Sequence, residues 1–310
     1  PDAPLIHDKE RNIVSEFKLA KGDVDQAFKE SDIVHSASYY TSQVYQAYLE
    51  PMACVTDIDL TGKLTFYLAT QIPSMTRLTY AKALNLPLEK IRVVVPYYGG
   101  AFGGKMETNL HLVAAVLSQK TGRPIRMVNP REEDFIAGNP RVPMYINLKM
   151  GAKKDGTLTA KEVSVIGAAG GRAVYSMVIV ATACYRVDSL YHFQNLKTEG
   201  VTAYTNTVPT GCFRGFGNAQ MTFALESSMD MIAEAIGMDP AELRIKNGLK
   251  TGEVSIHGWK IGSSGLTECI RKATEASGWR EKRAQKRSAR GIGLACCNHV
   301  SGNRAFAREF

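Results

Sequence analysis

A glycine-rich segment at residues 99–105 is the part of the sequence best suited to hold a small ligand. It reads Gly-Gly-Ala-Phe-Gly-Gly-Lys and lies between a β-branched run, typical of a buried strand, and a predicted helix. Glycine allows positive φ angles and a close approach of a ligand to the backbone. The helix start adds unpaired N–H groups and the positive end of a dipole, which favour an anion or an oxo group. Because Met106 follows Lys105, the segment is not a Walker A loop. A tight strand–helix connection without a ligand is the structural alternative.

A second glycine-rich segment, Gly211–Gly217, also precedes a predicted helix. Its Arg214 can present several N–H donors to an oxyanion or a phosphate. Phe216 is either a lid over the core or, beside a ligand, a wall on which a ring can stack. Cys212 offers a metal-binding thiol, although a lone cysteine is usually buried and inert. Two Gly-Phe-Gly loops in one chain therefore predict a shared ligand, an anionic cofactor with apolar walls for a substrate.

The elements that must position these loops predict an α+β fold, with mixed sheets built from hairpins and with packed helices, rather than regular βαβ alternation. Hairpins are predicted over 53–69 and over 144–166, where Lys153-Lys154-Asp155-Gly156 forms the turn. The other predicted strands cover 32–48, 91–96, 124–128 and 197–205. The predicted helices cover 24–29 after the N-cap Asp23, 73–84, 106–120, 219–236, a segment opened by Asp239-Pro240, and 266–277 after the N-cap Ser264.

Composition is that of an ordinary globular protein. The 310 residues are 45% hydrophobic and 22% charged, with a net charge of +8, which excludes a disordered or fibrous chain. The longest apolar stretch, 177–185, is far shorter than the about 20 residues of a membrane helix, so no membrane span is expected. Six cysteines without a CxxC pair indicate reduced thiols and a cytoplasmic location. The basic residues of 271–290 lack interleaved aromatic residues, so they favour a solvated surface or an acidic partner over nucleic acid.

The two loops resemble the GGGFGGK and FRGFG segments of the molybdenum hydroxylase family. That family includes xanthine dehydrogenase, aldehyde oxidoreductase, nicotinate dehydrogenase and 4-hydroxybenzoyl-CoA reductase. The resemblance covers roughly residues 20–300 and implies a molybdenum-cofactor-binding domain of this type. Further matches occur in the family's order at Glu50-Pro51, Thr70-Gln71, Arg131-Glu132-Glu133 and 233–247.

The resemblance also implies roles for individual residues. Gln71 would hydrogen-bond the molybdenum oxo group, Phe102 and Gly103 would lie beside the metal, and Phe216 would flank the substrate ring. No side chain would ligate the metal directly. The expected catalytic residues are Gln71, Phe102, Arg214 and Phe216. The expected cofactor-binding residues are Gln71, Gly100, Ala101, Phe102, Gly103, Arg214, Gly215, Phe216 and Gly217.

Departures from the family pattern bear on the substrate. Met106 stands where xanthine-oxidising members carry a Glu, and Thr182 stands approximately where they carry a substrate-binding Arg. Both changes argue against xanthine and favour an aromatic, N-heteroaromatic, aldehyde or acyl-thioester substrate. Segments at 203–207, 269–279 and 300–304 lean toward 4-hydroxybenzoyl-CoA reductase, which has His in place of Phe216. Reductive dehydroxylation of an aromatic acyl-CoA and a non-catalytic scaffold chain therefore stay open as alternatives. Arg141 and Lys105 are expected to be surface residues, with anchoring of anionic substrates as the other possibility.

The family's catalytic Glu has no match here, since Glu50, Glu107 and Glu226 do not correspond to it. We therefore expect a partial molybdenum subunit, natural or truncated. Residues 1–22 would be a linker, 23–290 the molybdopterin-binding domain with two subdomains, and 291–310 the start of a missing second domain. The resemblance implies molybdopterin, in its cytosine dinucleotide form, and water as the oxygen source. It also implies a second half of the molybdenum subunit, a [2Fe–2S] subunit, an FAD subunit and a dimer of such heteromers.

Overall fold

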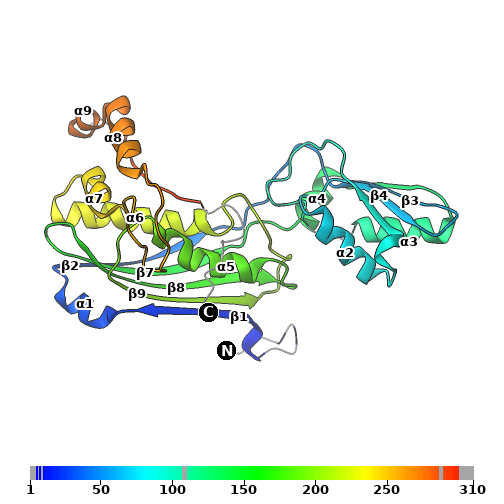
Figure 1. Cartoon of the computed structure of the whole chain (residues 1–310), viewed down its shortest axis with the longest axis horizontal. Coiled ribbons are helices and arrows are strands. Elements are labelled where there is room, and N and C mark those ends of the chain that lie inside the picture. Colours follow the sequence, from blue (N-terminus) through cyan, green and yellow to red (C-terminus); the bar gives the residue numbers. More distant parts are fainter. Residues whose placement is uncertain (1–4, 6, 8–9, 107–109, 286–288, 300–310) are drawn as a thin grey trace.

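The computed structural model describes residues 5, 7, 10–106, 110–285 and 289–299. These residues form two bodies, each built on its own sheet, which follow one another along the long axis of the molecule (Figure 1). The large body has the strand order β1-β9-β8-β7-β2, and the small body has the order β5-β4-β3-β6. The chain leaves the large sheet after β2 (Ile33–Thr41) and returns to it at β7 (Met144–Ala152). The small body is therefore an insertion between two adjacent strands of the large sheet.

The centre of the large sheet is the antiparallel hairpin of β7 and β8 (Leu158–Gly170), which confirms the prediction over 144–166. Its turn contains Gly156 at a φ of 86°, a conformation that favours glycine. β9 (Asn195–Tyr204) runs parallel to β8, so a crossover must separate the two strands. The crossover contains α5 (Ser176–Tyr185) and the 3₁₀ helix η3 (Arg186–Ser189).

The edge of the large sheet is β1 (Ile13–Lys21), which follows the short 3₁₀ helix η1 (Glu10–Asn12). β1 pairs antiparallel with β9. The expectation that residues 1–22 form a linker is therefore wrong for this segment. β1 has no fully buried side chain, so its sequence lacks the hydrophobic alternation that marks a strand. Its pairing partner, β9, lies far along the chain, so no local pattern predicts the pairing. The next helix, α1 (Val24–Glu30), is confirmed, and the Asp23 carboxylate accepts from the N–H of Gln26 at its start.

Helices α5 and α6 (Asn218–Ile236) cover one face of the large sheet (Figure 1). The core between them is fully buried and includes Ile146, Val165 and Met221. No helix was predicted at α5. Most of its side chains are buried, so it lacks the polar stripe that marks an amphipathic helix. α7 (Pro240–Asn247) packs against α6, and the Asp239 carboxylate accepts from the N–H of Ala241 at the start of α7, as predicted.

The small body has its own core. The predicted hairpin is formed by β3 (Ala53–Ile58) and β4 (Leu64–Leu68), with β5 parallel to β4 and β6 antiparallel to β3. Leu64, Phe66 and Tyr80 are buried between this sheet and its helices. The remaining elements are α2 (Pro73–Ala83), η2 (Leu88–Lys90), β5 (Ile91–Val94), α3 (Leu110–Thr121), β6 (Ile125–Val128) and α4 (Arg131–Ala137).

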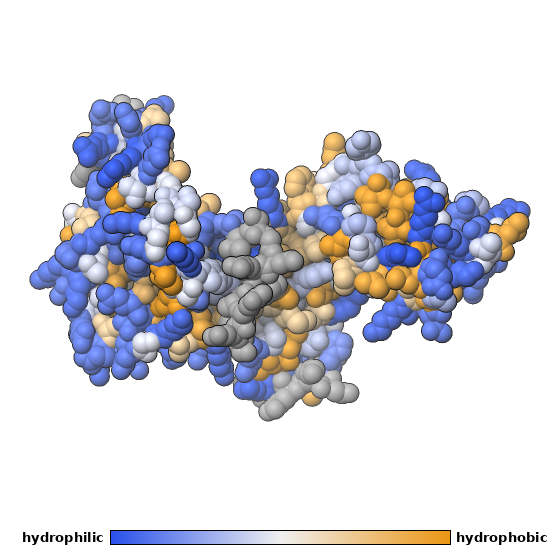
Figure 2. Space-filling view, viewed as in Figure 1, coloured by the Kyte–Doolittle hydropathy of each residue, from blue (hydrophilic) through white to orange (hydrophobic). Residues whose placement is uncertain are grey.

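Two helices, α8 (Leu266–Ser277) and α9 (Trp279–Ala284), project from the large body (Figure 1). Figure 2 shows mainly hydrophilic residues on them, whereas hydrophobic residues gather on the surface of the small body. Ser264 does not cap α8, because Gly265 holds the N-cap position and the Ser264 hydroxyl donates to the carbonyl of Leu249. Across the described ranges, no helix combines the length and apolarity needed to cross a membrane.

Candidate functional site

The two glycine loops belong to different bodies and meet between them. Residues 99–105 follow β5 in the small body, and residues 211–217 lead into α6 in the large body. The backbone N–H of Arg214 donates to the carbonyl of Phe102 at 3.0 Å. Gly103, at a φ of 101°, packs so closely that a Cβ there would lie 2.5 Å from the carbonyl oxygen of Cys212. The expected proximity of the loops is thus present, and Gly103 makes it sterically possible.

Each loop holds its phenylalanine in a left-handed backbone conformation. Phe102 has a φ of 51° and Phe216 a φ of 49°. This conformation is uncommon for bulky residues and is typical of positions that the surrounding structure constrains. Phe102 is 47% exposed beside the loop contact, whereas Phe216 is half-buried against the large core. The guanidinium of Arg186 lies 5.8 Å from the centre of the Phe216 ring.

Gln71 joins this site from the end of β4. Its Oε1 accepts from the backbone N–H of Gly103 at 2.9 Å, and its own backbone N–H donates to the carbonyl of Lys105 at 3.1 Å. The side chain is exposed. The hydrogen bond from Gly103 fixes which end of the amide is the oxygen, so Nε2 points the other way. No described residue accepts a hydrogen bond from Nε2. Gln71 therefore presents a donor beside the loop.

Lys105 is an internal brace of the first loop, so the expectation of a surface residue is wrong. Its side chain is fully buried, and Nζ lies 2.7 Å from Oε2 of Glu50. The same oxygen of Glu50 accepts from the N–H of Gly99 at 3.1 Å. Burial of Glu50 opposes ionisation, but the hydrogen bonds from Lys105 and Gly99 outweigh it and lower the pKa of this carboxyl. The ammonium also lies 4.6 Å from the centre of the Tyr48 ring. Lys105 cannot anchor a substrate from this position.

Arg141 supports the second loop and is half-buried, so the expectation of a surface residue is only partly met. Its guanidinium donates to the carbonyl of Arg214 and to Oε1 of Gln220, each at 3.1 Å. It also lies 4.1 Å from the centre of the Phe213 ring. Burial lowers the pKa of this guanidinium. Arg214 itself is exposed, and its side chain has no hydrogen bond or ion pair within the part of the chain that the structure describes.

Gln46 is a supporting residue that the sequence did not single out. Its Nε2 donates to the carbonyls of Cys212 and Asn139, at 2.6 and 2.8 Å. A Cβ on Gly104 would lie 3.0 Å from its side chain. Gln46 thus lies between the two loops. It falls within the predicted strand 32–48, which in fact ends at Thr41, and no local pattern marks its role.

Residues 296–298, which we call the C-terminal strap, are hydrogen-bonded to the large body near the start of α6. The N–H of Cys296 donates to Glu226 Oε2 at 2.7 Å, and Nδ2 of Asn298 donates to the Ser189 hydroxyl at 2.7 Å. The side chain of Asn218, the first residue of α6, donates to the carbonyl of Asn298. The strap therefore contacts α6 directly after Gly217.

Glu226 is a structural carboxylate. It also accepts from Arg244 Nε and from the Tyr191 hydroxyl, each at 2.7 Å. Burial first, and the charge of Glu226 second, raise the pKa of Tyr191. Thr182 is fully buried within α5, and Glu107 lies outside the described residues. Neither Glu226 nor Glu50 is free to act as a base.

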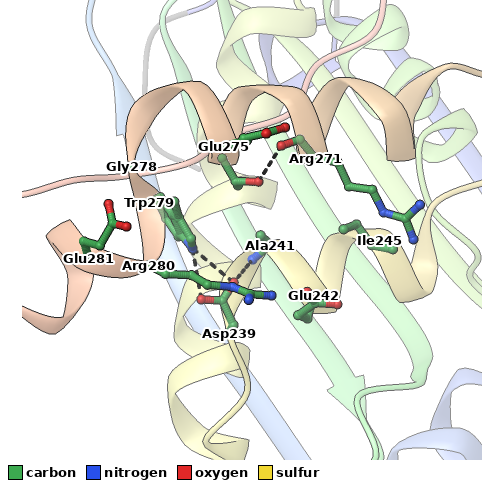
Figure 3. Close-up of a pocket in the computed structure, with 11 residues that line it drawn as sticks. Asp239, Ala241, Glu242, Ile245, Arg271, Glu275, Gly278, Trp279, Arg280 and Glu281 are labelled. Atoms are coloured by element: carbon green, nitrogen blue, oxygen red, sulfur yellow. Dashed lines mark hydrogen bonds between the residues drawn. The ribbon is translucent and has the colours of Figure 1, made fainter.

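Cavities elsewhere are separate from the loops. One of about 530 Å³ lies between α7 and the projecting helices, and neither loop lines it. Figure 3 shows Trp279 and Asp239 meeting there, where Nε1 of the indole donates to the carboxylate at 2.9 Å. Asp239 also accepts from the N–H of Ala241, so the polar groups of this cavity join helices to one another. A cavity of about 690 Å³ lies beside the strap.

The donors at the loop contact suit an anionic, oxygen-rich ligand. Gln71 Nε2 and the Arg214 guanidinium are both available, and Phe102 adds an exposed ring. Among the described residues, no three His, Cys, Asp or Glu side chains gather where they could hold a metal ion. Gly100, Ala101, Gly215 and Gly217 belong to the same two loops. The structure thus brings Gln71 to the first loop, and Phe102 and Gly103 of that loop to the second. The roles expected for the individual residues stay predictions.

Comparison with known proteins identifies the same class of site. Residues 6–248 match the family model of the molybdopterin cofactor-binding domain. The chain is 37% identical over 275 residues to the nicotinate dehydrogenase large molybdopterin subunit of Eubacterium barkeri, covering 88% of this chain and 64% of that subunit. It is 31% identical to the putative xanthine dehydrogenase molybdenum-binding subunit XdhA of Escherichia coli, covering 97% of this chain and 41% of XdhA.

The fold agrees with these relatives. The aldehyde oxidoreductase from Desulfovibrio gigas superposes with a TM-score of 0.88 at 27% identity, over 93% of this chain and 32% of that one. The chain therefore spans less than two thirds of the length of the proteins that it matches.

Proposed function

The chain belongs to the molybdopterin cofactor-binding domain family of the molybdenum hydroxylases, and from that premise we propose that it builds one side of a hydroxylase site. The substrate is an aromatic, N-heteroaromatic or aldehyde-type molecule, and water supplies the oxygen. The single observation that carries this proposal is the contact of Gln71 with the first glycine loop, which itself contacts the second, while the Gln71 amide keeps a free donor. When bound, the molybdenum cofactor supplies an oxo acceptor and two-electron redox chemistry.

The residues of this chain bind and orient. Gln71 would donate from Nε2 to the oxo acceptor, because its oxygen is held by the N–H of Gly103. The backbone of 100–103 and of 215–217 would hold the cofactor, and the Arg214 guanidinium would balance its negative charge. Phe216 positions the substrate ring, and Phe102 helps to exclude water. These four side chains are the catalytic residues that we propose.

The remaining functions come from other parts of the assembly. Glu50 and Glu226 are held by Lys105 and Arg244, so we assign the general base to a carboxylate outside the described residues. Electrons leave to iron–sulfur and FAD partners, and the cofactor is the cytosine dinucleotide form. In domain terms, residues 23–290, with β1 and the strap, form the molybdopterin-binding part, and we propose a second molybdenum-binding domain outside the described residues. We place this assembly, a dimer of heteromers, in the cytoplasm.

The test is a Gln71→Met variant of the assembled protein, with Gln26→Met on α1 as the control. Loss of a preorganised donor costs roughly 10²–10³ in kcat, so Gln71→Met is expected to lose that much while Gln26→Met keeps full activity. Elemental analysis of the wild-type complex accompanies the kinetics. A complex without molybdenum would contradict the proposal, and so would a fully active Gln71→Met enzyme.

Reductive dehydroxylation is the second candidate, favoured by the sequence likeness at 203–207 and 269–279. Phe216, in place of the reductase's His, weighs against it. Incubation with a 4-hydroxyaroyl thioester and a reduced electron donor separates the two reactions. Consumption of the thioester supports dehydroxylation, and hydroxylation that requires an electron acceptor supports the first proposal.

A further inference from the structure

We propose that the outer edge of β2 pairs with β2 of a second copy of this chain, so that two large sheets join into one continuous sheet. β2 is the last strand of the order β1-β9-β8-β7-β2, at the opposite edge from β1 (Figure 1). The inference rests on the proposed function where that calls for a dimer of heteromers, because it names the surface through which the dimer forms. The two glycine loops take no part in it.

One side of β2 is fully paired, whereas the other side has no backbone partner among the described residues. All nine residues, Ile33–Thr41, are in register with β7. No backbone hydrogen bond joins β2 to any described strand or loop other than β7. The outward N–H and C=O groups therefore form a row with which a further strand can pair.

The side chains of β2 show that its outer flank is accessible. Ala37 and Tyr39 lie on the face that α6 covers, yet both are only half-buried. Their partners on the next strand, Leu148 and Ile146, are at most 1% exposed. α6 therefore covers β7 completely and leaves the flank of β2 open, so a neighbouring strand has room to approach.

β2 also lacks the features that usually keep edge strands from pairing with other chains. Charged side chains and β-bulges are common protective devices. β1 has both, with Glu16, Lys18 and Lys21 and a register shift near its start. β5 and β6 are only four residues long, and each contains an arginine. Of these four edge strands in the described part of the chain, β2 alone contains no Lys, Arg, Asp or Glu, and its register has no shift.

The occupant that fits this edge is β2 itself, because its sequence is complementary to itself in one antiparallel register. A twofold axis through Ala37 places Val34 opposite the partner's Tyr40 and Ser36 opposite the partner's Ser38. Val34 and Tyr40 are 44% and 53% exposed, and pairs of an aromatic and a β-branched residue stabilise adjacent strands. The small side chain of Ala37 lies at the axis, and the whole strand is paired. Such twofold contacts between identical surfaces are the commonest in homo-oligomers.

The test uses two double variants of the assembled protein, Ser36→Lys with Ser38→Lys and Ser36→Glu with Ser38→Glu. In the proposed register each variant places like charges directly opposite one another. We expect the dissociation constant of the dimer to rise about 100-fold, so that the mass measured by sedimentation falls by half. The matched control, Ala20→Lys with Gln26→Lys, adds the same charge at exposed positions away from this edge and should keep the wild-type mass.

Mixing the lysine and glutamate variants separates a broken interface from a folding defect. Opposite charges then face each other, so the mixture is expected to regain the dimer mass, which misfolded chains would not do. A wild-type protein with the mass of one assembly would overturn the inference. Dimers that persist in both charge variants, or a mixture that stays dissociated, would overturn it as well. Loss of a different polypeptide instead of halving would also overturn it and would identify that polypeptide as the occupant of the edge.

The mass measurements are independent of the hydroxylase chemistry, because they need neither turnover nor bound molybdenum. A complex without molybdenum would contradict the proposed function, while halving in the charge variants and recovery on mixing would still support the pairing of β2. Conversely, an active enzyme with the mass of one assembly would overturn the pairing and leave the proposed chemistry in place.

Discussion

Gly103 illustrates how a single residue joins the two halves of the site. Its N–H is donated to Gln71, and its α-carbon leaves room for the carbonyl of Cys212. Any side chain here would meet backbone atoms, which cannot rotate away. The glycine is therefore needed both for its positive φ and for the approach of the second loop.

We expect Gly103→Ala to weaken the contact between the loops and to lower cofactor retention. The added methyl would lie 2.5 Å from the Cys212 oxygen, and a φ of 101° strains any residue with a Cβ. Each effect costs roughly 1–3 kcal/mol. Molybdenum content and melting temperature measure the result. Gly262→Ala is the control, because a Cβ there meets nothing within 4 Å and its φ is not in the left-handed region. Equal behaviour of the two variants would argue against this role of Gly103.

The Glu50–Lys105 pair predicts a pH dependence of stability. The pKa of Glu50 is lowered in the folded protein, so its contribution is complete above its ordinary value of 4.5 and is lost as pH falls toward the folded value. Glu50→Gln is expected to cost about 1 kcal/mol at pH 7, because the buried ammonium loses a charged partner that is itself 40% exposed and therefore partly screened by water. Melting curves from pH 7 to 3 should show the gap between wild type and variant closing below pH 4.5. A gap independent of pH would contradict the assignment.

At the residue scale, the sequence predicts the two glycine loops but not the buried contacts that support them. Residues 99–105 and 211–217 carry a motif, since each needs a run of glycines at one place in the chain. Lys105, by contrast, was expected at the surface. Its burial depends on Glu50, which lies 55 positions earlier, and on the Tyr48 ring. No local pattern records such a distant partner.

Among the elements, α6 connects the second loop to the rest of the large body. Its first residue, Asn218, bonds the strap, and Glu226, two turns later, bonds both Cys296 and Arg244. The strap is therefore hydrogen-bonded to α6 both at its first residue and near its middle.

Glu226→Gln is expected to cost roughly 3–5 kcal/mol, because it leaves the buried Arg244 guanidinium without its best counter-charge. Chemical denaturation monitored by tryptophan fluorescence measures the loss. Glu234→Gln, an exposed position on the same helix, should stay within about 0.5 kcal/mol of wild type. Similar losses at both positions would show that the buried network contributes nothing specific.

The elements that the sequence predicted are those with local signals. Hairpins at 53–69 and 144–166 have alternating residues and a turn motif, and α1 and α7 have an Asp N-cap. The missed elements have no such signal. α5 is mostly buried, and among the described strands β1 pairs with β9 alone. Their structures follow from tertiary contacts rather than from local preference.

On the scale of the whole molecule, the small body depends on its own core. Phe66 is fully buried between β3, β5 and α2, whereas Tyr67 on the same strand points away and is 45% exposed. We expect Phe66→Ala to cost about 3–5 kcal/mol, and Tyr67→Ala far less. Hydrogen exchange should show the loss over 53–128 more strongly than in the large sheet. Uniform loss of protection across both bodies would indicate that they unfold as one unit.

The insertion of the small body between β2 and β7 has a thermodynamic consequence. Gln71 and the first loop come from one body, and Arg214 and Phe216 from the other, so the proposed binding surface is complete only when the bodies are docked. A ligand that contacts both is linked to that docking equilibrium, and its binding free energy opposes their separation. The cofactor would then also hold the two bodies together. A protein assembled without it would have a less stable docking of the bodies, in addition to any loss of activity.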